Sequence, residues 1–256
     1  MTDASDAGAG RIILITGGTR GIGRAIALRF AREHPAHLVL AYNTNHDAAR
    51  STAQELLALG VACTTLATDL GRPSEIDALF ASVKERFDRL DVFVSNAARA
   101  AFRDAVALSQ RSWQRTLDLN ASAFLLASQR AAALMPARGG SIVGLSSAGS
   151  QRCAPGYLAL GAAKAALEAT ARYLAVELAP RNINVNVVCG GLIESPELFA
   201  SAELAPYVRR AIERTPAGRL GRPEELAEVV EFLASPRAAW IRGQTIIVDG
   251  GHSLVL

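Results

Sequence analysis

Residues 11–16 of the chain are Arg-Ile-Ile-Leu-Ile-Thr, and residues 17–23 continue with Gly-Gly-Thr-Arg-Gly-Ile-Gly. The continuous apolar run, rich in β-branched side chains, predicts a strand that is buried on both faces. In the turn after it, Gly17 lets the backbone bend sharply, Gly21 lets it approach a phosphate, and Gly23 lets the next helix pack closely. The start of that helix offers free N–H groups and the positive end of its dipole. The segment therefore predicts a pyrophosphate-binding turn.

The same alternation of strand and helix continues to the end of the chain. Further strands are predicted at 37–42, 61–68, 91–95, 141–146, 183–188 and 245–249. Helices are predicted at 23–32, 47–59, 74–87, 112–135, 157–178 and 223–234. Seven strands alternating with helices, without a break in composition, predict an α/β fold. We expect a single doubly wound Rossmann-type domain with a seven-stranded, mainly parallel sheet.

The chain has one predicted domain with two less regular parts. Residues 1–10 are expected to form a flexible tail, and residues 11–256 the NAD(P)-binding domain. Within it, residues 190–222 form a connection much longer than usual, punctuated by three prolines. We expect this segment to be a substrate lid that excludes water when it orders on binding.

Composition excludes several classes of protein. The 256 residues are 50% hydrophobic and 20% charged, with a net charge of +3, which excludes a disordered chain. The basic residues are scattered and no apolar run reaches about 18–20 residues, so neither a nucleic acid nor a membrane is an expected partner. Three widely spaced cysteines fit a reducing cytoplasm better than disulfides, and no metal site is expected.

The residues after the second predicted strand bear on the choice of cofactor. NAD enzymes usually place an acidic residue there to bind the ribose hydroxyls. This chain has Tyr42, Asn43 and Thr44, with no acid before Asp47. Arg20, in the glycine-rich turn, can reach a 2′-phosphate instead. Both features favour NADPH.

Further motifs make the chain resemble the short-chain dehydrogenase/reductase family from about residue 11 to residue 251. They are the 16–23 turn, Asp69, Ser95-Asn96-Ala97-Ala98, Asn120, Ser147, Lys164, Asn186 and Val248-Asp249-Gly250-Gly251. The resemblance implies a homotetramer and a set of cofactor-binding residues. These are Gly17, Thr19, Arg20, Gly21, Ile22, Gly23, Tyr42, Asn43, Thr44, Asp69, Leu70, Asn96, Ala97, Lys164, Gly191, Ile193 and Ser195.

The resemblance also assigns individual roles. Asp69 and Leu70 would bracket the adenine, Lys164 would bind the nicotinamide ribose, and Asn120 would shape the active site. Ile193 and Ser195 would contact the nicotinamide end. Of the 27 basic residues only Lys84 and Lys164 are lysines. A lysine supplies a compact ammonium group with a tunable pKa that arginine lacks.

One departure from the common family pattern is informative. That pattern places a tyrosine four residues before the lysine, but here the residue at that position is Leu160. Tyr157 lies seven residues before Lys164, a spacing found in enoyl-acyl-carrier-protein reductases. With the ordinary glycine-rich turn, the combination looks like enoyl-acyl-carrier-protein reductase III.

The spacing suits the chemistry of that class. Residues seven apart return to nearly the same helix face, about 10 Å apart along the axis. In enoyl reduction the hydride goes to Cβ while charge develops on the thioester oxygen, so the hydrogen-bond donor must lie further from the hydride. We therefore expect NADPH-dependent reduction of a trans-2-enoyl thioester of acyl carrier protein or CoA, in fatty-acid or polyketide biosynthesis. The predicted catalytic residues are Tyr157, Lys164, Ser147 and Asn120.

Two other functions stay open at this point. One is a 3-ketoacyl or other carbonyl reductase of the same family, and the other is a non-catalytic NADP-binding sensor. Arginines near the predicted lid, among them Arg209, Arg210 and Arg214, could meet an acidic carrier protein, although a solvated face is the simpler interpretation. Tyr173 is expected in the core or at an interface.

Overall fold

A computed structural model describes residues 10–33, 36–99, 102–200 and 205–255. The predicted tail, apart from its last residue, and four residues of the predicted lid (201–204) lie outside these ranges. The described chain forms one seven-stranded sheet in which every pairing is parallel, in the order β3-β2-β1-β4-β5-β6-β7. The strands are β1 (Arg11–Thr16), β2 (Ala36–Tyr42), β3 (Ala62–Ala67), β4 (Val92–Ser95), β5 (Gly140–Ser147), β6 (Ile183–Gly190) and β7 (Thr245–Val248). The predicted fold class and all seven strands are confirmed.

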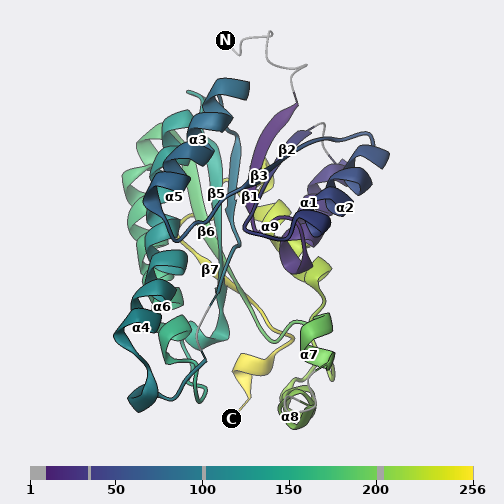
Figure 1. Cartoon of the computed structure of the whole chain (residues 1–256), viewed down its shortest axis with the longest axis vertical. Helices are drawn as coiled ribbons and strands as arrows, with labels where there is room; N and C mark the ends of the chain where they lie inside the picture. The colour runs from purple at the N-terminus through teal and green to yellow at the C-terminus, as the bar shows by residue number, and fades with distance from the viewer. Residues whose placement is uncertain (1–9, 34–35, 100–101, 201–204, 256) are drawn as a thin grey trace.

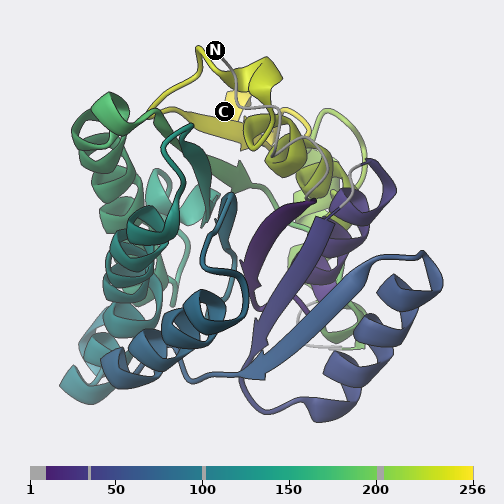
Figure 2. The same cartoon turned by 90° about the horizontal axis from the view of Figure 1, so that it is seen from above.

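Helices cover both faces of the sheet (Figure 1). On one side lie α3 (Pro73–Phe87), α5 (Ala123–Leu134) and α6 (Leu158–Glu177), preceded at the lower end by α4 (Gln110–Leu117). On the other side lie α1 (Gly21–Glu33), α2 (His46–Ala58) and α9 (Pro223–Leu233). Figure 2, seen from above, shows the sheet twisting between these two layers. The arrangement follows from right-handed crossovers between parallel strands.

Each layer has its own apolar core. Phe93 and Phe124 are fully buried between the sheet and the α3–α5–α6 layer, and Phe30 is fully buried under α1 on the other side. Burying one such side chain contributes about 1.5–3 kcal/mol to folding. β1 and β6 are both buried on both faces. β1 is the apolar run that the sequence showed, whereas β6 buries Asn184 and Asn186, whose side-chain amides donate to the carbonyl oxygens of Ala238 and Ile241.

The prediction of one continuous helix at 112–135 is wrong, because the helix is interrupted. The chain forms α4, then a π-helical turn η3 (Asp118–Ser122), then α5. In the turn, the Asn120 side-chain amide donates hydrogen bonds to the carbonyl oxygens of Thr116 and Arg99. A side chain that satisfies backbone acceptors in this way supports a local widening of the helix, a feature that often marks functional sites.

Tyr157 was predicted within a helix but lies just before it. It is the N-cap residue of α6, with φ −97° and ψ 0°. The other boundaries differ from prediction by one or two residues, as expected where terminal turns fray. The predicted strand 183–188 extends to Gly190, because β6 continues to pair with β5 and β7.

The long connection at 190–222 is not a plain loop. It contains α7 (Pro196–Ala200) and α8 (Ala205–Arg214), which lie below the carboxyl ends of the strands (Figure 1). A parallel bridge between Ile193 and Gly221 joins the two ends of the segment. Short 3₁₀ turns complete the described chain: η2 (Ala105–Ala107), η4 (Ala148–Ser150), η5 (Ala179–Arg181), η6 (Pro236–Ala238) and η7 (His252–Leu254).

Within the described ranges, no helix has both the length and the apolar character that crossing a membrane requires. The same residues contain no cluster of three or more potential metal ligands.

Candidate active site

The glycine-rich turn joins β1 to α1 at the carboxyl edge of the sheet. Gly17 adopts φ +64°, which glycine tolerates best, and its N–H donates to the Ala41 carbonyl oxygen. A Cβ on Gly23 would overlap the Gly17 carbonyl oxygen, so α1 can start this close only at a glycine. By contrast, a Cβ on Gly21 would have no other atom within 4 Å, and no acidic residue lies in the first turn of α1. The turn fits an anionic ligand as predicted.

Asn96 holds this turn from the neighbouring strand. Its side-chain amide donates to the carbonyl oxygens of Thr16 (3.0 Å) and Gly17 (3.1 Å). The backbone N–H groups of Asn96 and Ala97 both donate to the Thr16 hydroxyl. Asn96 and Ala97 therefore lie beside the predicted phosphate site, where they were expected.

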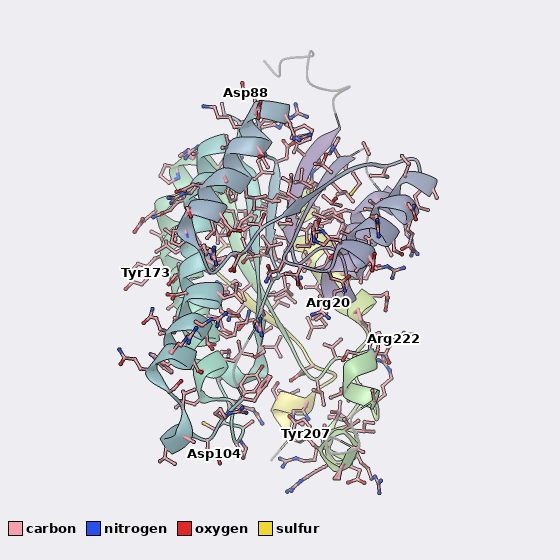
Figure 3. The ribbon with its side chains drawn as sticks, in the orientation of Figure 1. Arg20, Asp88, Asp104, Tyr173, Tyr207 and Arg222 are labelled. Atoms are coloured by element: carbon pink, nitrogen blue, oxygen red, sulfur yellow. The ribbon has the colours of Figure 1, made fainter. Side chains whose placement is uncertain are left out.

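The predicted 2′-phosphate region lies at the ends of β1 and β2. Arg20 is exposed at the start of α1, on the same side of the molecule as Arg222 and well above Tyr207 of α8 (Figure 3). Tyr42 donates to or accepts from the His46 imidazole at 2.9 Å, and Asn43 and Thr44 are exposed. The structure brings Arg20 and these residues to one edge of the sheet without an acidic side chain between residues 42 and 46.

Tyr157 and Ser147 meet at the centre of the carboxyl edge. The Tyr157 hydroxyl lies 3.0 Å from the Ser147 hydroxyl, which closes β5. Burial raises the pKa of Tyr157, and the hydrogen bond from Ser147 offsets only part of that rise. The phenol is therefore protonated around neutral pH and can donate a hydrogen bond to a developing oxyanion.

Two glycines and a leucine explain why the tyrosine is placed there. A Cβ on Gly149 would overlap Cδ1 and Cε1 of the Tyr157 ring, and a Cβ on Gly161 would lie 2.5 Å from the Gly149 carbonyl oxygen. Leu160, which has the position of the common family tyrosine, is buried in the apolar core. The phenol thus occupies space that only glycine at 149 leaves free.

Lys164 is buried at the same end of the sheet. Its ammonium group donates a hydrogen bond of 2.7 Å to the carbonyl oxygen of Leu145, two residues before Ser147. Burial lowers the pKa of Lys164 to about 8, and attraction to Cys189 and Glu168 offsets part of that change. β5 therefore positions both predicted catalytic groups: Ser147 binds Tyr157, and Leu145 binds Lys164.

Asn120 contributes a buried acceptor. Its amide nitrogen is bound to Thr116 and Arg99, while its side-chain oxygen Oδ1 has no hydrogen-bond partner among the described residues. Burying an unsatisfied acceptor costs free energy, so such an atom marks a place where a bound molecule or water would be stabilised. Asn120 fits a site that receives a polar ligand.

The remaining predicted cofactor residues lie around the same edge. The Asp69 carboxylate accepts from Gly71 N–H, Leu70 is buried against the core, and the Ser195 hydroxyl accepts from Leu198 N–H at the start of α7. Gly191 N–H donates to the Val248 carbonyl oxygen, and Ile193 bridges Gly221. Thr19 is buried and Ile22 half-buried, so their contribution to a ligand would come from their backbone. Direct contact with a cofactor stays a prediction for all of them.

A cavity of about 620 Å³ opens from Tyr157 and Ser147 toward the lid. Its inner wall is formed by the ends of β5, β6 and β7, and its outer wall by α8. A cavity of this size holds a small organic substrate. It includes Tyr207, Arg210 and Arg214 of α8 and Arg152 from the turn after β5.

The sequence interpretation missed a buried carboxylate. Glu168 accepts from the Ser146 hydroxyl at 2.5 Å and lies 2.6 Å from the Ser150 hydroxyl. It joins α6 to the 146–150 segment that carries both Ser147 and Gly149. An acid four residues after Lys164 in an Ala-rich helix was the available signal. Gly149 itself carried none, because its role depends on a contact with a residue eight positions away.

Comparison with known proteins identifies the family of the chain. A family model described as enoyl-(acyl carrier protein) reductase matches residues 17–253. The chain belongs to the short-chain dehydrogenase/reductase family. It is therefore an oxidoreductase of a family that binds a nicotinamide cofactor, which confirms the resemblance found in the sequence.

Individual relatives cover nearly the whole chain. A 1-cyclohexenylcarbonyl-CoA reductase of Streptomyces collinus is 43% identical over 96% of this chain and 88% of its own length. A solved angucycline C-6 ketoreductase with bound NADP is 32% identical, with a TM-score of 0.88, covering 95% and 96% of the two chains. An acetoin dehydrogenase from Enterobacter cloacae is 29% identical, with a TM-score of 0.87 and 96% coverage of both.

The crowding at Gly149 predicts the effect of one added methyl group. In Gly149→Ala the new Cβ displaces the Tyr157 ring, so its hydroxyl leaves Ser147. We expect kcat to fall by about 10- to 100-fold, because removing one well-placed oxyanion donor costs about 10²–10³ in rate. Cofactor affinity, measured by fluorescence titration, should stay at the wild-type value.

A double-mutant cycle separates this effect from general damage. If Gly149 acts by positioning the Tyr157 hydroxyl, adding Gly149→Ala to Tyr157→Phe lowers kcat little further. If the double variant instead loses the product of the two single fold-changes in kcat, Gly149 does not act through the Tyr157 hydroxyl.

The lowered pKa of Lys164 predicts that the enzyme binds its cofactor less effectively at alkaline pH. Lys164 is a cation below pH about 8 and neutral above it, because burial lowers its pKa to about 8. The value of kcat/KM for the nicotinamide cofactor, which reports on the free enzyme, should therefore fall as pH rises through about 8. Circular dichroism at each pH controls for unfolding. A flat profile up to pH about 9.5 would contradict the expected role of the ammonium group.

Proposed function

We propose that the chain reduces the 2,3 double bond of a trans-2-enoyl thioester with NADPH. The observation that carries the proposal is the placement of the phenol. Tyr157 caps α6 seven residues before Lys164 and is hydrogen-bonded to Ser147, while Leu160 fills the common tyrosine position as a buried core residue. The similarity to 1-cyclohexenylcarbonyl-CoA reductase, whose name denotes an α,β-unsaturated CoA thioester, supports the same reaction.

The chain's residues have separate tasks in this reaction. NADPH, when bound, supplies a hydride for Cβ of the substrate. Tyr157 donates its hydrogen bond to the thioester oxygen, where the negative charge of the enolate develops, and Ser147 orients the phenol. A proton is then taken up at Cα, which leaves a saturated thioester. Such a product suits fatty-acid or polyketide assembly.

The second group of residues serves the cofactor. Lys164 would bind the nicotinamide ribose, and its positive charge would favour polarisation of the phenol. The unsatisfied Oδ1 of Asn120 would accept a hydrogen bond near the same place. The open space at Gly21 would receive the pyrophosphate, so the residues present fit a dinucleotide.

A carbonyl reductase is the second candidate. The serine–tyrosine pair at 3.0 Å would also serve a ketone oxygen, and one of the similar solved structures is a ketoreductase. The position of the phenol relative to Lys164 favours the enoyl substrate. A non-catalytic sensor is less well supported, since Tyr157 and Ser147 meet in the wall of one cavity and Lys164 is held behind them by the Leu145 carbonyl oxygen.

A homotetramer is part of the proposal. Tyr173 and Val176, three residues apart on α6, are 72% and 75% exposed, and Tyr173 points away from the sheet (Figure 3). Tyr173 is therefore not a core residue, and its predicted place at an interface is supported by this exposed apolar face. Trp240, before β7, and Leu254, after it, are also exposed.

The proposed reaction predicts a clear substrate preference. We expect rapid NADPH oxidation with a trans-2-enoyl CoA thioester and slow oxidation with the matching 3-ketoacyl thioester. In Tyr157→Phe the enoyl rate should fall by about 10²–10³, because the oxyanion donor is lost. Both rates are measured by absorbance at saturating cofactor.

Tyr173→Phe is the matched control, because it removes the same atom from an exposed tyrosine of α6. Its rate should equal that of the wild type. Turnover of the ketoacyl thioester alone would replace the proposal with a carbonyl reductase, and NADPH binding without turnover of either would favour the sensor.

The cofactor preference is predicted to depend on Arg20. A charge-assisted hydrogen bond to a phosphate contributes about 1.5–3 kcal/mol, which is about 10- to 150-fold in affinity. Arg20→Gln should therefore raise KM for NADPH by at least about tenfold. The KM for NADH, which lacks the 2′-phosphate, serves as the internal control and should change little. Equal changes for both cofactors would place Arg20 away from the 2′-phosphate.

A further inference from the structure

The cavity that contains Tyr157 is basic at the wall furthest from the sheet. Arg210 and Arg214 lie one turn apart on α8 and line the cavity together with Tyr207 and Ala211. Residues three, four and seven apart share one face of a helix, so this face of α8 is directed into the cavity. Arg152, from the turn that follows Ser150, lines the cavity from the β5 side.

No described carboxylate neutralises these guanidinium groups by an ion pair. Among the described residues, no carboxylate lies within ion-pair distance of Arg152, Arg210 or Arg214. Arg219, also in the cavity wall, is different. It forms two hydrogen bonds with Glu225, at 2.8 and 2.6 Å, and holds the pKa of Glu225 at about 2.

Asp249, the other carboxylate of the cavity wall, is hydrogen-bonded to the backbone and not to an arginine. Asp249 accepts hydrogen bonds from the N–H groups of Gly251 (2.9 Å) and Ser253 (2.7 Å). The cavity therefore carries an excess of positive charge on two opposite elements. A concave site with such a charge raises the local concentration of anions and speeds their capture.

We infer that Arg152, Arg210 and Arg214 bind the phosphate groups of coenzyme A, while the acyl thioester reaches Tyr157. This rests on the proposed function, since it names the carrier of the same substrate. A CoA thioester has an uncharged pantetheine arm between the reacting carbonyl and its phosphates. The phenol and the arginines line one cavity, with Tyr157 at the start of α6, Arg152 in the turn after β5, and Arg210 and Arg214 on α8. Planar guanidinium groups bind phosphate oxygens in pairs, which makes arginine well suited to this task.

The place of the arginines in the cavity wall favours a small ligand over a protein surface. Arg209 and Arg210 are both exposed, but only Arg210 belongs to the cavity wall. An acidic carrier protein would meet the outward charge of Arg209 as well as the others. The phosphates of CoA enter the cavity itself and need only the inward face of α8. Arg209 is therefore a matched control: it has the same side chain on the same helix, but on another face.

The first test compares two substrates with the same enoyl group, the CoA thioester and the pantetheine thioester, which lacks the phosphates. For the wild type we expect KM for the CoA thioester to be lower by at least about tenfold, with an advantage that shrinks as salt is added. In R210Q/R214Q the KM of the CoA thioester should rise toward that of the pantetheine thioester. In R209Q it should remain at the wild-type value. Equal KM values for the two thioesters in the wild type would overturn the inference and leave the proposed enoyl reduction intact.

The second test needs no turnover. Free CoA is titrated calorimetrically into the protein saturated with NADP⁺, which keeps CoA out of the dinucleotide site. We expect R210Q/R214Q to bind CoA about 10- to 100-fold more weakly than the wild type, and R209Q to bind it normally. Melting temperatures show that each variant is folded. Unchanged CoA affinity in R210Q/R214Q, or an equal loss in R209Q, would overturn the inference.

An enoyl thioester of an acyl carrier protein provides the last arm. If it is reduced with a lower KM than the CoA thioester, and R209Q raises that KM as much as R210Q/R214Q does, the arginines serve a protein partner and the inference is wrong. If no thioester is reduced but CoA binds with the expected dependence on Arg210 and Arg214, the phosphate site stands while the proposed reaction fails.

Discussion

The hydrogen bond from the buried Lys164 ammonium group to the Leu145 carbonyl oxygen is the contact on which the candidate site depends. A charge taken out of water is costly unless hydrogen bonds compensate it, so this bond fixes the end of β5 against α6. Glu168, one turn further along α6, holds the next residues of the same segment through Ser146 and Ser150. Together the two charged side chains determine where Ser147 and Gly149 lie, and thereby where the phenol of Tyr157 can go.

The position of the Tyr157 ring depends on several residues around it. The ring needs the absence of a side chain at 149, the backbone of 149 needs the absence of a side chain at 161, and Leu160 is packed into the core. A tyrosine placed at 160 would have to turn out of the core toward the ring that already occupies the site. The two spacings of tyrosine and lysine are therefore alternative packings of the same helix end, and a change between them requires concerted substitutions.

The sequence predicted the fold because its signals were local and repeated. The apolar run at 11–16 identifies a strand buried on both faces, and the glycine-rich turn places the first helix directly after β1. The interruption of the helix around Asn120 escaped prediction, because it depends on a hydrogen bond to Arg99, 21 residues away. Tyr157, Lys164 and Ser147 could be selected from the sequence, because their spacing and motifs are local. Glu168 and Gly149 could not, because their roles depend on contacts between separate elements of the fold.

The fold of this chain does not by itself determine which reaction it catalyses. Solved structures that superpose over nearly the whole chain include an acetoin dehydrogenase and a ketoreductase, so the sheet and its helices are compatible with several reactions. In this chain the features that bear on the reaction lie in the turn after β5 and in the segment that carries α8. These two elements supply the room for Tyr157 and the positive wall of the cavity. A small apolar ketone would gain nothing from three guanidinium groups without carboxylate partners among the described residues, whereas a substrate with its own phosphates would compensate them. The charge of the cavity wall and the position of the phenol are independent observations, and both favour an acyl thioester over a simple ketone.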